Sequence, residues 1–148
     1  MDERHSVELQ AEVRAIRADV WPLLSTVGGL TRWLDGAEFR ADVGGPIRLR
    51  MRDALAVGTL LAFDPPQHVS FTFDWDAEPI GQPTVVALDA IDHGDSTHLT
   101  LRHVGLPGGR QRNLHEALWR YWFERLVRAA GQPGGQPGAG YRETAERS

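Results

Sequence analysis

The sequence predicts an α+β fold in which a curved antiparallel sheet of about seven strands is covered on one face by a long C-terminal helix, with two short helices after the first strand. Three observations support this prediction. Several segments alternate apolar and polar residues, which is typical of half-buried strands. One segment near the C-terminus carries a broad apolar stripe with helical spacing. The length of 148 residues fits one domain around one core.

The N-terminal part of the chain is predicted to form a strand followed by two short helices. In residues 6–14, apolar side chains alternate with charged or polar ones, as expected for a strand with one buried face. Asp19 stands where it can cap a short helix, whose first turn tolerates Pro22. A Gly-Gly pair at 28–29 breaks this helix before a second one that extends through Leu34.

The middle of the chain, from residue 38 to residue 104, predicts about six antiparallel strands separated by turns. The clearest strand covers residues 69–75, in which apolar and polar side chains alternate without interruption. Toward the end of this region, His103 shares one strand face with Leu99 and Leu101, so it is expected to point toward the core.

The last ordered element is predicted to be the long helix. Asn113 and Glu116 have the spacing of a capping box, and Gly131 follows the last residue of the stripe. The stripe consists of Trp119, Trp122, Phe123, Leu126, Val127 and Ala130. We therefore expect one domain over residues 1–130 and a flexible Gly/Pro-rich tail over residues 131–148.

The composition excludes several classes of function. The chain has no cysteine, which excludes disulfide frameworks and thiolate chemistry, and all 16 basic residues are arginine, which excludes Schiff bases and Walker-type phosphate loops. The net charge of −4 gives no reason to expect nucleic acid binding. No dinucleotide motif lies between a strand and a helix, so no cofactor is expected. The charged N-terminus and the lack of a long apolar stretch predict a cytoplasmic protein without a membrane span.

Two histidines are the sharpest candidates for polar groups in a pocket. His103 and His115 lie on faces otherwise made of leucines and aromatic residues, near the point where the last strand leads into the helix. Either each is a core or rim histidine with a local hydrogen bond, or they offer a donor or a base to a bound molecule. No third ligand lies at a spacing that suits a metal, and no nucleophile elbow is present. No metal ligand and no catalytic residue is therefore assigned.

Large aromatic residues of the sheet and the helix are expected to meet where the two elements face each other. They form either a packed core or the wall of a cavity, and an aromatic wall suits a planar apolar ligand. The candidate ligand-binding residues are Trp33, Phe71, Phe73, Trp75, His103, His115, Trp119, Trp122 and Phe123.

Six short stretches, in order along the chain, carry a family resemblance. They are Val-Trp at 20–21, Leu-x-x-Trp at 30–33, Val-Gly-Gly at 43–45, VGTLLAFDPPQHVSFTFDW at 57–75, STHLTLRHVGLP at 96–107 and HEALWRYWFERL at 115–126. This ordered set resembles the activator of heat-shock protein 90 ATPase-like (AHSA) family. That family belongs to the START/SRPBCC superfamily of polyketide cyclase/dehydrase and lipid transport-like proteins, which share the helix-grip fold.

The resemblance implies a hydrophobic pocket between the sheet and the C-terminal helix, but it implies no reaction, because a fold does not determine a function. Leu118 stands where the family often has glycine, so its side chain either narrows the cavity or packs. We expect binding of a hydrophobic, aromatic or lipid-like small molecule. Two alternatives stay open: a polyketide cyclase/aromatase- or hydrolase-like enzyme that uses a pocket histidine, and an interaction module for a heat-shock ATPase. The sequence gives no expectation for the oligomeric state.

Overall fold

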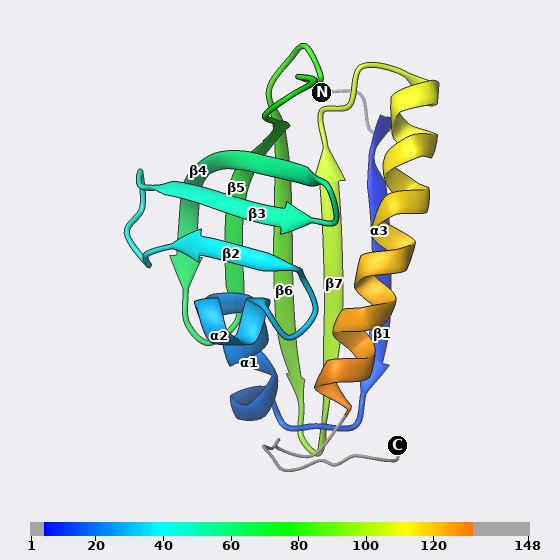
Figure 1. Cartoon of the computed structure of the whole chain (residues 1–148). Helices are drawn as coiled ribbons and strands as arrows, with labels where there is room; N and C mark the ends of the chain where they lie inside the picture. Colours follow the sequence, from blue (N-terminus) through cyan, green and yellow to red (C-terminus); the bar gives the residue numbers. More distant parts are fainter. Residues whose placement is uncertain (1–4, 132–148) are drawn as a thin grey trace.

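The computed structural model describes residues 5–131, so all of the predicted 131–148 tail except Gly131 lies outside the described residues (Figure 1). In chain order the elements are β1 (Val7–Val13), α1 (Arg17–Ser25), α2 (Val27–Leu30), β2 (Gly36–Phe39), β3 (Pro46–Met51), β4 (Ala54–Asp64), β5 (His68–Trp75), β6 (Thr84–His93), β7 (Ser96–Val104) and α3 (Gly109–Ala130). This order confirms the predicted α+β class and the helix-grip arrangement. Within the described residues, no helix has both the length and the hydropathy needed to cross a membrane.

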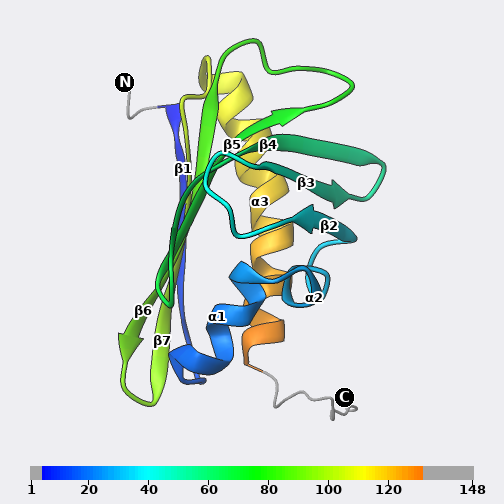
Figure 2. The same cartoon turned by 90° about the vertical axis from the view of Figure 1, so that its left-hand side faces the viewer.

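The seven strands form one antiparallel sheet in the order β1-β7-β6-β5-β4-β3-β2. In Figure 1, β1, β6 and β7 run along α3, whereas β2, β3 and the first part of β4 run at a steep angle to it, so the sheet is strongly curved. The pairing of β4 with β5 shifts register between Leu60 and Ala62, a bulge of the kind that bends a strand. Figure 2 shows that the curved sheet bends around the side on which α3 lies.

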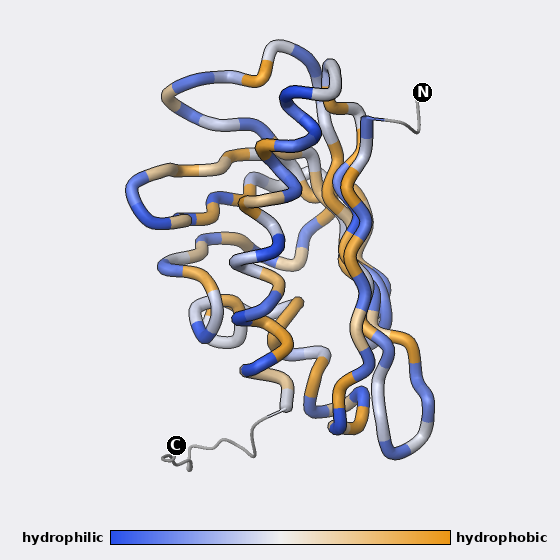
Figure 3. The backbone as a smooth tube through the Cα atoms, turned by 90° about the vertical axis from the view of Figure 1, so that its right-hand side faces the viewer, coloured by the Kyte–Doolittle hydropathy of each residue, from blue (hydrophilic) through white to orange (hydrophobic). Residues whose placement is uncertain are grey.

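The core lies between the curved sheet and α3. Along β7, Leu99, Leu101 and His103 are buried while the residues between them are partly exposed, as the alternation predicts. The same alternation appears as orange and blue segments along the strands in Figure 3. From the opposite side, α3 contributes the large buried side chains Trp119, Trp122, Phe123 and Leu126. The short helices α1 and α2 pack against the lower part of this core (Figure 1).

The structure corrects two predicted helix starts. The first helix begins at Arg17 after Ile16, which makes no side-chain cap, and Asp19 lies inside the first turn, where a carboxylate interacts favourably with the positive end of the helix. The long helix begins at Gly109, one turn before Asn113. Glu116 does not complete a capping box, because its carboxylate pairs with the arginines four residues before and after it.

Gly58 allows β4 and β5 to approach closely. A Cβ atom built on Gly58 would lie 1.7 Å from the carbonyl oxygen of Thr72, which is backbone and has little freedom to move. We expect Gly58→Ala to force the strands apart and to lower the free energy of unfolding by roughly 1–3 kcal/mol or more. Urea denaturation would measure the change. Gly28→Ala is the matched control because no atom lies within 4 Å of its added Cβ. Equal stability of both variants and the wild type would contradict the prediction.

Candidate functional site

A pocket of about 810 Å³ opens between the turn joining β3 to β4, the segment joining β5 to β6 and the N-terminal half of α3. All three segments lie in the upper half of the molecule in Figure 1. The apolar part of the wall includes Leu55, Trp75, Ile80, Leu114 and Leu118. Both the volume and the mixture of an apolar wall with a few polar groups are typical of small-molecule sites.

The charged side chains of the pocket have an acidic excess. Arg50 supplies one guanidinium, whereas Asp53, Asp76 and Glu78 supply three carboxylates, and all four residues are exposed. The local potential therefore favours an uncharged or cationic ligand over an anionic one.

Asp74 holds the β5–β6 segment in place beside the pocket. Its Oδ1 atom accepts hydrogen bonds from the backbone N–H groups of Trp75, at 2.8 Å, and Ile80, at 2.7 Å. Because both donors belong to pocket residues, one half-buried carboxylate fixes the backbone that carries two of the apolar side chains of the wall.

His115 is a polar group of the pocket wall and is almost fully buried. Its Nε2 atom accepts a hydrogen bond from Nε1–H of Trp75 at 3.1 Å, so the ring proton belongs on Nδ1, which donates to the carbonyl oxygen of Gln111 at 2.8 Å. The two rings lie nearly parallel, with centroids 6.1 Å apart. The hydrogen bonds therefore assign a neutral imidazole that orients the indole of Trp75.

His103 lies behind His115, with ring centroids 5.1 Å apart, and has no exposed surface. Its Nδ1 atom accepts from Nε1–H of Trp119 at 3.0 Å, and its Nε2–H donates to Oγ1 of Thr84 at 3.0 Å. The hydroxyl of Thr84 in turn donates to the carbonyl oxygen of Phe73. This series of hydrogen bonds satisfies every polar group that takes part in it. It also assigns to His103 the tautomer opposite to that of His115.

The buried position of both histidines disfavours their charged forms. Burial and, to a smaller extent, the nearby His115 together lower the pKa of His103 to about 3. Burial also lowers the pKa of His115, although the hydrogen bond to the carbonyl oxygen of Gln111 acts in the opposite direction. Both rings are therefore neutral at pH 7, in agreement with their hydrogen bonds, and only His115 reaches the pocket wall.

The structure separates the nine expected ligand-binding residues into two groups. Trp75 and His115 line the pocket. The other seven are buried in the core: Trp33, Phe71, Phe73, His103, Trp119, Trp122 and Phe123. Part of this core directly supports the pocket, since the ring of Phe73 lies 5.0 Å from that of Trp75 and 6.4 Å from that of His115.

Several pocket residues are not among the candidates from the sequence. Leu55 lies at the start of β4, in a run of apolar residues without clear alternation, Ile80 lies in the segment joining β5 to β6, and Leu114 lies on the exposed side of α3, so no periodic pattern marks them as pocket residues. Leu118, expected either to narrow the cavity or to pack, does both: it lines the pocket and is packed against the core.

Comparison with known protein families gives a match over most of the chain. Residues 14–131 match the model of a protein family described as Activator of Hsp90 ATPase homolog 1-like protein. No curated protein sequence matches the chain significantly.

Several solved structures share the fold. Protein MLL2253 from Mesorhizobium loti is 19% identical with a TM-score of 0.74, and the match covers 84% of this chain and 95% of that one. CalU16 from Micromonospora echinospora is 19% identical with a TM-score of 0.70, covering 84% and 75%. PFC0360w, an HSP90 activator from Plasmodium falciparum, is 19% identical with a TM-score of 0.69, covering 82% and 92%. At these identities the likeness shows the fold alone.

Proposed function

The chain belongs to the family of Activator of Hsp90 ATPase homolog 1-like proteins, and from this premise we propose that it binds an uncharged, planar apolar small molecule in the pocket between the sheet and α3. The observation that carries the proposal is the pocket of about 810 Å³, in which one tryptophan and several aliphatic side chains surround a neutral histidine. No step of catalysis is needed to account for this arrangement.

The preference for a planar ligand follows from how Trp75 is held. Phe73 packs edge-on against its ring, with centroids 5.0 Å apart, and the Nε1–H group is bound by His115. An indole fixed in this way offers a preorganised aromatic surface, and stacking on it costs little side-chain entropy. The excess of acidic side chains in the pocket disfavours the binding of carboxylate ligands such as fatty acids, because like charges repel each other.

Leu118→Trp tests the proposal by adding bulk to the pocket wall. The full-length protein is titrated with an uncharged flavonoid, an uncharged anthraquinone and a long-chain fatty acid, and binding is measured by calorimetry. We expect saturable binding of at least one planar probe, weaker binding of the fatty acid, and an affinity about tenfold lower or worse in Leu118→Trp, because the larger side chain fills ligand space.

Leu61→Trp is the matched control for this titration. Leu61 is a 45% exposed leucine of β4 that does not line the pocket, so the same substitution there should leave the affinity unchanged. The proposal is wrong if neither planar probe binds the wild type, or if both tryptophan variants bind as tightly as the wild type.

A second function, interaction with an Hsp90-type ATPase, is favoured by the family description and by the fold shared with the Plasmodium falciparum HSP90 activator. If this protein acts in that way, adding it to a purified Hsp90 should raise the rate of ATP hydrolysis. An unchanged rate, together with no binding in a pull-down, would remove this second function without affecting the ligand-binding proposal.

A further inference from the structure

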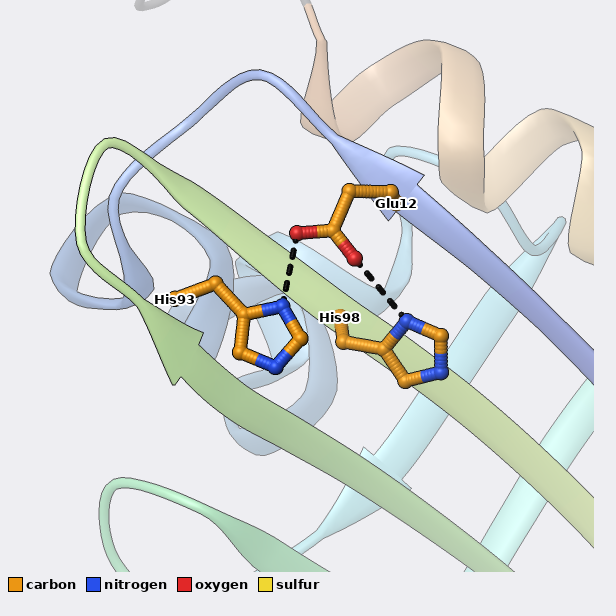
Figure 4. A group of neighbouring side chains, drawn as sticks. All are labelled: Glu12, His93 and His98. Carbon is orange, nitrogen blue, oxygen red and sulfur yellow. Dashed lines mark hydrogen bonds and ion pairs between the residues drawn. The ribbon is translucent and has the colours of Figure 1, made fainter.

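Three polar residues from three strands meet on the face of the sheet opposite α3. Glu12 of β1 pairs directly with His98 of β7, and His93 at the end of β6 lies diagonally across from His98. All three side chains point to the side opposite the core, because each occupies a position of its strand that alternates with the buried ones. Figure 4 shows the two carboxylate oxygens of Glu12 facing the two imidazole rings, one oxygen toward each ring.

The donor atoms of this cluster are spaced nearly as metal ligands are. Nδ1 of His93 lies 2.8 Å from Oε2 of Glu12, and Nδ1 of His98 lies 3.0 Å from Oε1. One ligand atom from each residue falls within 4.8 Å of the others. In a tetrahedral zinc site with bonds of about 2.0–2.1 Å, neighbouring donors lie roughly 3.3 Å apart. Small side-chain movements would therefore bring the three donors to coordination distance.

We propose that Glu12, His93 and His98 form a binding site for a divalent transition metal of the zinc type, with water in the fourth position. Two imidazoles and one carboxylate are a ligand set that suits Zn²⁺, and they leave room for such a water. The metal takes the place of the protons that the imidazole Nδ1 atoms share with the carboxylate (Figure 4).

The residues around the cluster act as an outer shell. Oε1 of Gln10 lies 2.8 Å from Nε2 of His98, where it accepts the N–H that a ligating histidine usually donates to an oxygen. Ser96 donates from its hydroxyl to Oε2 of Glu12. These contacts orient His98 with Nδ1 toward the carboxylate and keep the carboxylate in place, so part of the order that a metal site needs is already present.

The site is open to solvent, and it joins an edge strand of the sheet to a hairpin. The side chains of Glu12, His93 and His98 are 45%, 48% and 25% exposed, so an ion reaches them from solvent without any opening of the fold. β1 is an edge strand that pairs only with β7 among the described strands. A metal bound to all three residues would link this edge to the β6–β7 hairpin and stabilise the folded chain.

Titration with Zn²⁺ tests the site. The full chain, prepared without a histidine tag and stripped with a chelator, is titrated with Zn²⁺ alone by calorimetry. We expect saturable binding of one ion per chain and a higher melting temperature in its presence. Glu12→Gln, His93→Gln and His98→Gln should each weaken binding about 100-fold or abolish it, while Gln10→Ala, which removes an outer-shell acceptor, should weaken it roughly tenfold.

The matched control is His68→Gln on the same face of the sheet. Nδ1 of His68 lies 2.7 Å from Oδ1 of Asp89, a histidine–carboxylate pair that is not part of the three-residue cluster. This variant should bind Zn²⁺ as the wild type does, and circular dichroism in chelator reports whether each variant is folded. The proposal is overturned if the wild type binds no Zn²⁺ saturably, or if the three ligand variants bind it as tightly as His68→Gln.

Discussion

Trp119→Ala should lower the free energy of unfolding by about 3–5 kcal/mol, because it removes a buried aromatic side chain from the centre of the core. Trp119 is 1% exposed and contacts Phe73 and His103, with ring centroids 5.6 Å and 6.2 Å away. The substitution leaves a cavity and also removes the donor that Nδ1 of His103 accepts from. A buried acceptor without a partner adds to the cost of the cavity. Chemical denaturation followed by circular dichroism would measure the loss.

Tyr121→Ala, two residues further along the same helix, is the matched control. Tyr121 is 42% exposed, and the guanidinium of Arg52 lies over its ring at 4.7 Å from the centroid. Removing this exposed ring should cost only about 0.5–1 kcal/mol, the usual worth of a cation–π contact at the surface. If Trp119→Ala were no more destabilising than Tyr121→Ala, the packed core described between α3 and the sheet would be wrong.

The strands and the long helix could be predicted from the sequence because their signal is local. Alternation along β5 and β7 and the stripe on α3 depend on neighbouring residues alone, and all three elements are where the patterns indicate. The first residues of the helices were harder to predict, because a side chain that could cap a helix can also bind other groups. The carboxylate of Glu116 is bound by two arginines of the same helix, and the capping-box spacing, with Asn113 as the N-cap in place of Gly108, predicted a start five residues too late.

The pocket could be predicted only in part, because periodicity gives the face of a residue and not the distance to the opposite element. Trp75 and Trp119 both point to the inner side of the fold and both contact Phe73, yet Trp119 is fully buried in the core while Trp75 lines the pocket. Whether a cavity lies beside each ring depends on how β3, β4 and the β5–β6 segment close over the N-terminal half of α3.

The cluster of Glu12, His93 and His98 could not be predicted from the sequence for the same reason. The sequence alone assigns no metal ligand, because Glu12 and His98 are separated by 86 residues and become neighbours only through the register of β1 against β7. Alternation does place both residues on the solvent side of their strands. The register, which long-range packing determines, supplies the rest.

The unfolding free energy should fall by about 2 kcal/mol between pH 7 and pH 5, because His103 binds a proton more readily in the unfolded chain than in the folded one. The ordinary pKa of 6.5 applies to the unfolded chain, whereas burial lowers the pKa of folded His103 to about 3. The stabilisation is therefore complete above pH 6.5 and is lost as the pH falls from 6.5 toward 3. Protonation would also place an Nδ1–H group against the Nε1–H group of Trp119.

Urea denaturation at several pH values between 7 and 5 measures this dependence. The lowered pKa of His115 adds to the loss of unfolding free energy in the same pH range, whereas Glu12 and Glu116, whose pKa values are lowered by their hydrogen bonds, add a loss mainly below pH 4.5. His103→Gln removes the titrating ring, so its unfolding free energy should vary less with pH than that of the wild type. Thr84→Val is the matched control: it removes the hydroxyl that accepts from Nε2–H of His103 but keeps the ring. That variant should be less stable at every pH and retain the wild-type pH dependence. If His103→Gln instead retains the full dependence, the buried neutral state of His103 is not its source.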